Sequence, residues 1–345
     1  MTTPSLTEKE LDYYSRQIVL KNMGLSGQRK LKDSKVCVVG AGGLGSPILT
    51  QLSSMGVGYI RVIDRDVVDI SNLQRQFLYG THVLGVPKVE AAKERLRLIN
   101  PFIEIDPIPM PITPRNAVKL IQGVDIVIDA LDAMAPRYAL NRACHDLGIP
   151  FIHGGVIMQN GTASTIIPGE TACLECFQGD IRDEELPSCA VQGVHPSIIS
   201  LIGSIQVSEA VKIILGETPS LYNKLLFADL SDLSVDKIKL SRLESCPVCG
   251  TGDRNKIDFS TWEEVCGREE GRTFVYNPEV NEEVSLEKVK RNVVKMGYKL
   301  LIHSELGLTF EKKDMRGSII VSGVSIFEGL RLLEDAKNIR RDLLS

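Results

Sequence analysis

Short apolar runs alternate with stretches whose apolar residues recur at helical spacing over the first half of the chain. Each run has the length of a β-strand, and most runs end near glycine, proline or aspartate. The predicted strands are residues 35–40, 59–64, 103–109, 124–132, 150–156 and 161–168. The predicted helices between them lie within residues 41–57, 88–98, 114–122 and 137–147. This alternation predicts an α/β fold, a Rossmann-like doubly wound sheet covered on both faces.

The regular alternation stops at residues 178–196, a polar stretch with glycine and proline that predicts a long loop. An apolar helix is expected next, over residues 197–215. A stretch rich in glycine, aspartate and asparagine at residues 250–255 then predicts a domain boundary. We therefore expect a first domain over residues 1–252 and a second domain over residues 255–345.

The second domain is expected to be a small α+β unit. Its pattern reads as a strand at residues 273–278, a helix at residues 286–297, three further strands, and a final helix from Ser325. The only tryptophan, Trp262, lies near its start.

Composition narrows the class of protein. The 345 residues are 43% hydrophobic and 24% charged, with a net charge of −4 and a pI of about 5.9. This balance does not favour binding to nucleic acid or to an acidic membrane surface. The N-terminal region is polar and charged, without the apolar segment of a signal peptide, so we expect a cytoplasmic protein.

A glycine-rich loop follows the first predicted strand and opens a helix. Its glycines are Gly40, Gly42, Gly43 and Gly45, and Asp64 ends the next strand. Such a loop lets phosphates approach backbone N–H groups at the positive end of a helix, and the acid can hold ribose hydroxyls. The pattern fits NAD as well as ATP, and some glycine loops only pack a helix against a sheet.

The residues after this loop favour a triphosphate. Asn72, Arg75 and Gln76 follow the second strand, Lys88 begins the next helix, and Asp132 ends the fourth strand. A triphosphate needs cations to neutralise its charge before a nucleophile can approach the α-phosphorus. Arginine and lysine supply that charge, and an aspartate can hold Mg²⁺ through a hard oxygen. Each charged residue alone would more commonly be solvated surface.

Four of the eight cysteines form two CxxC pairs, Cys173 with Cys176 and Cys246 with Cys249. Two such pairs can supply four thiolates to one tetrahedral Zn²⁺, which would leave no open position and make the metal structural. The alternative is a set of free or redox-active thiols, but no thioredoxin-like pattern surrounds either pair.

Residues 10–250 resemble the MoeB/ThiF/E1 superfamily of enzymes that activate ubiquitin-like proteins, which includes archaeal and bacterial E1-like enzymes. The segments that carry the resemblance are YYSRQIVL, VVGAGGLGSP, VIDRDVVDISNLQRQF, GVPKVEAA, DALD, CLEC, CAVQGV, IGSIQVSEAVKIILG and CPVCG. The resemblance implies that Asp64 binds the ATP ribose, that Asn72, Arg75 and Lys88 engage the phosphates, and that Asp132 binds Mg²⁺. It also agrees with a zinc site at the two CxxC pairs.

The resemblance further implies a homodimer, because Arg16 would reach the triphosphate held by the partner subunit. Two positions depart from the usual family pattern. The family usually has arginine where this chain has Tyr13, and asparagine after the metal-binding aspartate, where this chain has Ala133.

The reaction implied by the resemblance is adenylation of a protein. A ubiquitin-like or sulfur-carrier protein ending in Gly-Gly would offer its carboxylate to the α-phosphate of ATP, giving an acyl-adenylate and pyrophosphate. Two alternatives from other classes stay open at this point. One is an NAD-dependent oxidoreductase, and the other is a non-catalytic module that holds ATP or a partner protein.

Cys189 lies in the predicted loop, where several relatives place a working cysteine. The resemblance implies that it takes the acyl group as a thioester. The alternative is an adenylyltransferase of the molybdopterin-synthase type, which acts on a sulfur carrier without a thioester. The second domain loosely resembles the β-grasp domain by which ubiquitin E1 enzymes recruit an E2, so an E2-like enzyme is a further expected partner.

Overall fold

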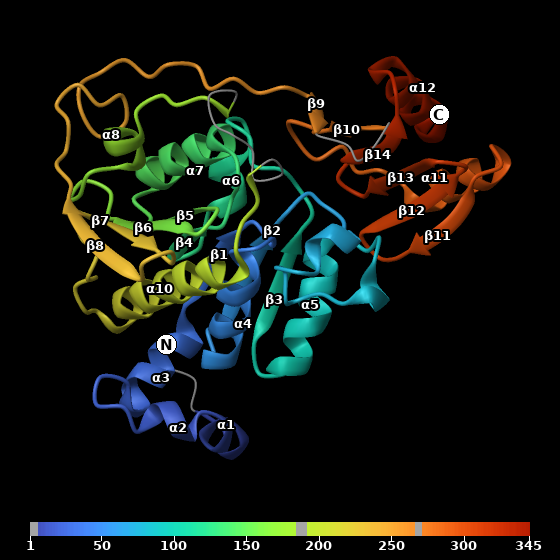
Figure 1. The fold of residues 1–345 in the computed structure, drawn as a ribbon. Coiled ribbons are helices and arrows are strands. Elements are labelled where there is room, and N and C mark those ends of the chain that lie inside the picture. The colour runs from blue at the N-terminus through green and yellow to red at the C-terminus, as the bar shows by residue number, and fades with distance from the viewer. Residues whose placement is uncertain (1–5, 184–191, 266–270) are drawn as a thin grey trace.

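An eight-stranded sheet forms the centre of the first domain in the computed structural model, which describes residues 6–183, 192–265 and 271–345 (Figure 1). The strand order is β3-β2-β1-β4-β5-β6-β7-β8. Pairing is parallel from β3 to β5 and antiparallel from β5 to β8. The strands are β1 (Lys35–Val39), β2 (Tyr59–Ile63), β3 (Glu104–Ile108), β4 (Ile126–Asp129), β5 (Phe151–Ile157), β6 (Asn160–Ile166), β7 (Lys224–Asp229) and β8 (Ser234–Lys239).

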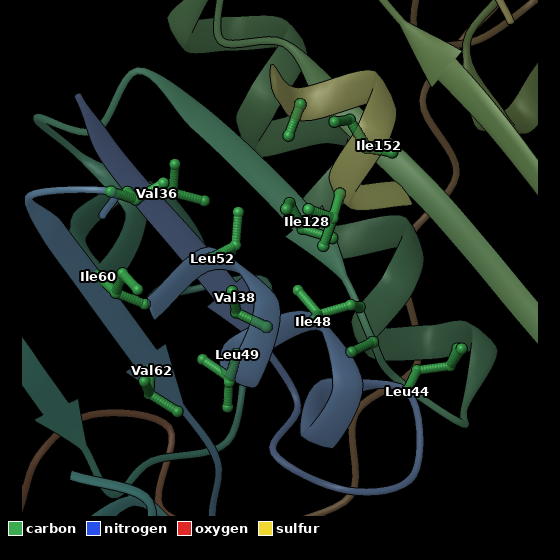
Figure 2. Close-up of a cluster of buried hydrophobic side chains, with 14 of the residues drawn as sticks. Val36, Val38, Leu44, Ile48, Leu49, Leu52, Ile60, Val62, Ile128 and Ile152 are labelled. Carbon is green, nitrogen blue, oxygen red and sulfur yellow. The ribbon is translucent and has the colours of Figure 1, made fainter. Parts of the chain in front are cut away.

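Helices cover both faces of this sheet because its central strands are apolar on both sides. In β1, Val36 and Val38 face one core cluster, whereas Cys37 and Val39 face the other. Figure 2 shows the first cluster, where Leu49 of α4 lies beside the strands. The helices are α3 (Gly24–Asp33), α4 (Gly45–Met55), α5 (Lys88–Ile99) and α10 (Pro196–Leu215) around the first cluster, and α6 (Ala117–Ile121), α7 (Met134–Leu147) and α8 (Leu174–Gln178) around the second. The predicted doubly wound α/β fold is confirmed.

Helix α10 is long and apolar enough to cross a membrane by length and composition alone. In the folded chain it packs against α4, β5 and β6. Its residues Ile198, Ile199 and Ile202 are fully buried in the first cluster. Its apolar composition is therefore accounted for by its place in the core of the domain.

The N-terminal helices α1 (Glu8–Tyr13) and α2 (Ser15–Ile18) precede α3. Helix α3 was not predicted from the sequence. Helix α1 begins with a capping box, in which Thr7 and Glu10 exchange hydrogen bonds. Glu10 also forms an ion pair with Lys32 of α3 at 2.7 Å, which joins the first and third helices.

A six-stranded sheet forms the second domain, with the order β11-β12-β13-β14-β10-β9 and antiparallel pairing throughout. Its core contains Phe274, Phe310 and Phe327, covered by two helices. The elements are β9 (Trp262–Val265), β10 (Arg272–Tyr276), α11 (Leu286–Lys295), β11 (Lys299–His303), β12 (Gly307–Lys312), β13 (Met315–Ile320), β14 (Ser325–Leu330) and α12 (Leu333–Leu344). The expected α+β composition of this domain is confirmed.

One expectation about the C-terminal end was wrong. The segment from Ser325 forms strand β14 rather than the start of the final helix, which begins at Leu333. Ile326 and Phe327 are buried, and β14 pairs with both β10 and β13, so the demand for paired backbone groups in the sheet decides the local structure. The likeness to a β-grasp domain stays a prediction.

Candidate active site and metal centre

The glycine loop connects β1 to α4, and its backbone packs closely against neighbouring backbone. Gly40 has a φ of +100°, and a Cβ atom there would overlap the carbonyl oxygen of Ala130. A Cβ atom at Gly45 would overlap the carbonyl oxygen of Gly40. Glycine is therefore required at both positions, because the backbone of the loop passes against itself and against the end of β4.

Asp64 links the glycine loop to the segment that follows β2. Its carboxylate accepts a hydrogen bond from the backbone N–H of Ala41 at 2.7 Å and another from that of Asp66 at 2.8 Å. Burial raises the pKa of Asp64. Each carboxylate oxygen has a second lone pair, so Asp64 can still accept hydrogen bonds from hydroxyl groups of a nucleotide ribose.

Lys88, at the start of α5, is only 5% exposed and forms an ion pair with Asp66 at 2.8 Å. Burial alone would lower the pKa of Lys88, but Asp66 and Asp64 outweigh it and raise the pKa. Burial alone would raise the pKa of Asp66, but Lys88 and Arg65 outweigh it and lower the pKa. The site thus holds a charged lysine in a buried position beside the glycine loop.

Asp66 was not among the residues that sequence analysis singled out. The signal was present, because Asp64 and Asp66 are two residues apart after a strand and can therefore point the same way. An acid beside another acid is most simply read as solvated surface, and only the fold shows that Lys88 pairs with Asp66.

The residues expected to engage phosphates lie in the turn after β2. Asn72 ends the short helix η1 (Ile70–Asn72) and accepts a hydrogen bond from the backbone of Asp69 at 3.3 Å. Arg75 donates to the carbonyl oxygen of Ser71 at 3.0 Å.

Gln76 is the most informative member of this turn. Its side chain is buried, and its Oε1 atom has no hydrogen-bond partner within the described part of the chain. Its Nε2 atom is the nearest neighbour of the position that a Cβ atom on Gly42 would take, at 3.5 Å. The amide therefore faces the glycine loop, and its Oε1 is a buried acceptor that a polar ligand or a water molecule can satisfy.

Asp132 lies after β4 with an exposed side chain. Its negative charge contributes to the raised pKa values of Lys88 and Arg65, so it lies within electrostatic reach of the segment after β2. Asp132 therefore lies at the same end of the parallel strands as the glycine loop, where Ala130 lies against Gly40. An exposed carboxylate at this position is the type of ligand that Mg²⁺ takes.

A buried network fixes the end of β4 and the turn that leads to Asp132. Asp129 is fully buried and accepts from the N–H of Leu131 at 3.0 Å, while Arg137 Nε and His153 Nδ1 lie 2.8 Å and 2.9 Å from its Oδ2. Arg137 also donates to the carbonyl oxygens of Leu131 and Gly154. The network holds the turn that carries Asp132, and burial lowers the pKa of His153.

The two departures from the usual family pattern each have a structural counterpart. Tyr13 donates from its hydroxyl to the carbonyl oxygen of Ile99 at 2.8 Å. Ala133 stands at the N-cap of α7 and has no capping side chain, but the carboxylate of Asp183 accepts from the N–H groups of Met134 and Ala135 at 2.6 Å and 3.2 Å. Asp183 therefore supplies the cap that Ala133 cannot supply.

The roles of two predicted site residues, Arg16 and Cys189, stay predictions. Arg16 is exposed on α2, among the N-terminal helices at the bottom of Figure 1, and its role in a partner subunit stays a prediction. Cys189 falls within residues 184–191, outside the described residues, so its role also stays a prediction.

The two CxxC pairs come together, as the sequence predicted. Cys173 and Cys176 lie at the start of α8, and Cys246 and Cys249 lie after β8. All four Sγ atoms lie within 4.8 Å of one another, with 3.5 Å from Cys173 to Cys246 and 3.2 Å from Cys176 to Cys249. A tetrahedral Zn²⁺ with bonds of about 2.3 Å requires sulfurs at comparable spacing, so the cluster fits one such ion.

Comparisons with known proteins identify the family of this chain. A sequence profile described as the ThiF family matches residues 14–248. The chain belongs to the ThiF family. It is 37% identical to the SAMP-activating enzyme E1 of Haloferax volcanii over 76% of this chain and 98% of that protein. It is also 37% identical to the molybdopterin-synthase adenylyltransferase of Escherichia coli over 71% of this chain and 98% of that protein.

Among solved structures, E. coli MccB, determined with AMPCPP and MccA, has a TM-score of 0.63 at 23% identity, over 71% of this chain and 75% of that one. At this identity the likeness concerns the fold alone. The curated relatives are named as adenylyltransferases and E1-like activating enzymes, so this ThiF-family chain is an enzyme of the adenylyltransferase class. That class sets aside both the NAD-dependent oxidoreductase and the non-catalytic module.

Proposed function

We propose that this chain binds ATP and adenylates the C-terminal glycine of a ubiquitin-like or sulfur-carrier protein. The observation that carries the proposal is the charged, buried Lys88 beside the glycine loop, held by Asp66 and Asp64. A dinucleotide diphosphate needs little beyond a helix N-terminus, whereas a triphosphate under nucleophilic attack needs fixed cations. The names of the relatives support the same choice of nucleotide.

The chemical step needs no side-chain base, because the attacking carboxylate is already ionised at neutral pH. A carboxylate oxygen of the terminal glycine forms a bond to the α-phosphorus, and the bond from that phosphorus to the β-phosphate oxygen breaks. Pyrophosphate leaves with the electron pair, and the partner carries an acyl-adenylate. Lys88 and Arg75 act by positioning the phosphates and neutralising the charge that the leaving group gains.

Two metals accompany this proposal. Asp132 would hold Mg²⁺, which supplies further neutralisation of phosphate charge when bound. The four cysteines would hold Zn²⁺ with no open coordination position, which makes that ion structural. The two CxxC pairs lie far from each other in sequence, so the metal would join α8 to the segment after β8.

The partner protein is proposed from the relatives. One is named for activating SAMP, another is named a sulfur carrier protein adenylyltransferase, and a third is named for molybdopterin synthase. A Gly-Gly-ended partner is common to our sequence-based expectation and to this proposal. The proposal also includes three sequence-based expectations. They are a homodimer completed by Arg16, an E2-like partner and a cytoplasmic location.

The direct test is mass spectrometry of a Gly-Gly-ended partner incubated with the enzyme, ATP and Mg²⁺. We expect a partner species heavier by one adenylyl group, and no such species when the terminal carboxylate is blocked as an amide. A partner that stays unmodified while the enzyme reduces or oxidises a nicotinamide coenzyme would refute the proposal.

A second step at Cys189 is the finer part of the proposal. The thiolate would attack the acyl carbonyl of the adenylate, forming a C–S bond as the bond to AMP breaks, with the thiol proton passing to solvent. We expect a thiol-sensitive enzyme–partner adduct on a non-reducing gel, absent in Cys189→Ala. Adenylation without any such adduct would favour the molybdopterin-synthase type of reaction.

A further inference from the structure

The second domain packs against the segment that carries the nucleotide residues. We name this segment, residues 64–88 from the end of β2 to the first residue of α5, the crossover. It contains Asp64, Asp66 and Gln76, and it ends at Lys88. Figure 1 shows the orange and red second domain lying against it. Arg65 and Val67, which contact the second domain, alternate in sequence with Asp64 and Asp66. Glu90, a further contact, lies two residues after Lys88.

Arg65 is the first of these contacts. It lies between Asp64 and Asp66, and its side chain turns to the second domain, where it pairs with Glu263 at 2.8 Å and donates to Asn277 at 2.6 Å. Burial alone would lower the pKa of Arg65, but Glu263 and Asp66 outweigh it and raise the pKa. Arg65 thus fixes the backbone between the two acids from outside the site.

Glu90 is the second contact, one helical half-turn after Lys88. Its carboxylate accepts three hydrogen bonds from a single turn of the second domain. They come from the hydroxyl of Ser304 at 2.7 Å and from the N–H groups of Glu305 and Leu306, both at 3.1 Å. Glu90 therefore fixes the start of α5, where Lys88 lies.

Apolar and backbone contacts complete the interface. Val67 packs with Val275, Ile320 and Ile326 of the second domain in one buried cluster. Thr309 donates to the carbonyl oxygen of Gly85 at 2.7 Å. The second domain thus holds the crossover near both of its ends.

We propose that the second domain is a built-in clamp on the crossover, and that Arg65 and Glu90 are positioning residues which raise the affinity for ATP. This inference rests on the proposed function. The two relatives described above align over 98% of their own length yet over no more than 76% of this chain, and the family match ends at residue 248. They therefore offer no counterpart of the second domain.

The physical reason is preorganisation. A crossover that is ordered only when nucleotide binds must lose conformational freedom at that moment, and the loss is subtracted from the binding free energy. A crossover already fixed by a second domain avoids that cost. The clamp should therefore act on the binding of ATP and leave the chemical step largely unchanged.

The test uses the full chain and compares Arg65→Met and Glu90→Ala with matched controls on the exposed side of α5, Arg95→Met and Glu94→Ala. Steady-state ATP–pyrophosphate exchange gives KM for ATP and kcat. Hydrogen exchange of the crossover amides reports on its order. We expect KM to rise about tenfold in both variants with kcat within about twofold of the wild type, and faster exchange in the crossover. Both controls should behave as the wild type.

Conservative variants separate positioning from general destabilisation. Arg65→Lys keeps the charge, and Glu90→Gln keeps one acceptor, so each should recover part of the affinity. Variants with an unchanged KM and unchanged hydrogen exchange would overturn the clamp. A wild-type chain without ATP–pyrophosphate exchange would contradict the proposed function instead, and hydrogen exchange of the crossover would then decide the clamp on its own.

Discussion

The crossover and the cysteine cluster both gather side chains that can carry charge, and they differ in the partners that balance this charge. In the crossover, Lys88 is paired with Asp66, and Asp64 accepts two backbone hydrogen bonds. In the cluster, the contacts of the four sulfurs are other sulfurs and the N–H groups of Leu243 and Val248.

This difference indicates what each region is built to hold. The crossover is balanced by its own side chains, so a phosphate must compete with Asp66 for Lys88 and can leave again after reaction. Four thiolates held together repel one another unless a cation joins them. The cluster is therefore suited to a permanent metal, and the crossover to a substrate that turns over.

Loss of the metal should have the largest effect on the molecule. Cys246→Ala should release the zinc and lower the free energy of unfolding by on the order of 5 kcal/mol, because binding free energy at a structural site is folding free energy. Metal analysis and chemical denaturation measure both quantities. Cys144→Ala, which removes a buried sulfur from the same core cluster, should keep the zinc and cost about 1 kcal/mol. Equal losses in the two variants would contradict a metal role.

Loss of the buried cation should have the next largest effect. Lys88→Met should lower kcat/KM for adenylation about a hundredfold, or about 3 kcal/mol, because the phosphate charge would lack its fixed counter-charge. Lys93→Met on the same helix is the matched control. A decrease of similar size in both variants would mean that the helix, rather than the charge of Lys88, matters.

Asp132→Asn should have a smaller effect, about tenfold in kcat/KM, together with a higher Mg²⁺ concentration for half-maximal rate. The exposed Asp33→Asn serves as a control for the loss of one acid. Unchanged dependence on Mg²⁺ in Asp132→Asn would move the metal site elsewhere.

The smallest effect concerns the buried network behind Asp132. Because the pKa of His153 is lowered from 6.5 in the folded chain, its contribution to stability is complete above pH 6.5 and is lost as the pH falls through the folded-state pKa. Stability measured from pH 7.5 downward should fall below 6.5 in the wild type. His153→Gln should reduce that slope, and the exposed His82→Gln should not.

Much of this arrangement could be predicted from sequence, because its signals are local. The glycine loop is defined by close backbone contacts at Gly40 and Gly45, and such contacts admit one residue type. The two CxxC spacings likewise fix the ligand chemistry of the cluster. Near-continuous apolar runs predicted a sheet covered on both faces, and β1 indeed buries residues in both core clusters.

The parts that could not be predicted depend on distant contacts. Asp66 reads as a solvated acid until the fold places Lys88 against it. Arg65 and Glu90 lie within segments that carry the family resemblance, but only the fold shows that they contact the second domain. Asp183 replaces the missing cap at Ala133 from another segment, and the pairing of β14 with two neighbours overrides a helical pattern after Ser325.

Incorporation of labelled pyrophosphate into ATP, with and without a Gly-Gly-ended partner protein, tests the central claim most directly. The account predicts incorporation that needs the partner's free terminal carboxylate and Mg²⁺, and that falls sharply in Lys88→Met. Incorporation that ignores the partner, or none at all from a folded, zinc-loaded chain with any Gly-Gly-ended protein supplied, would contradict it.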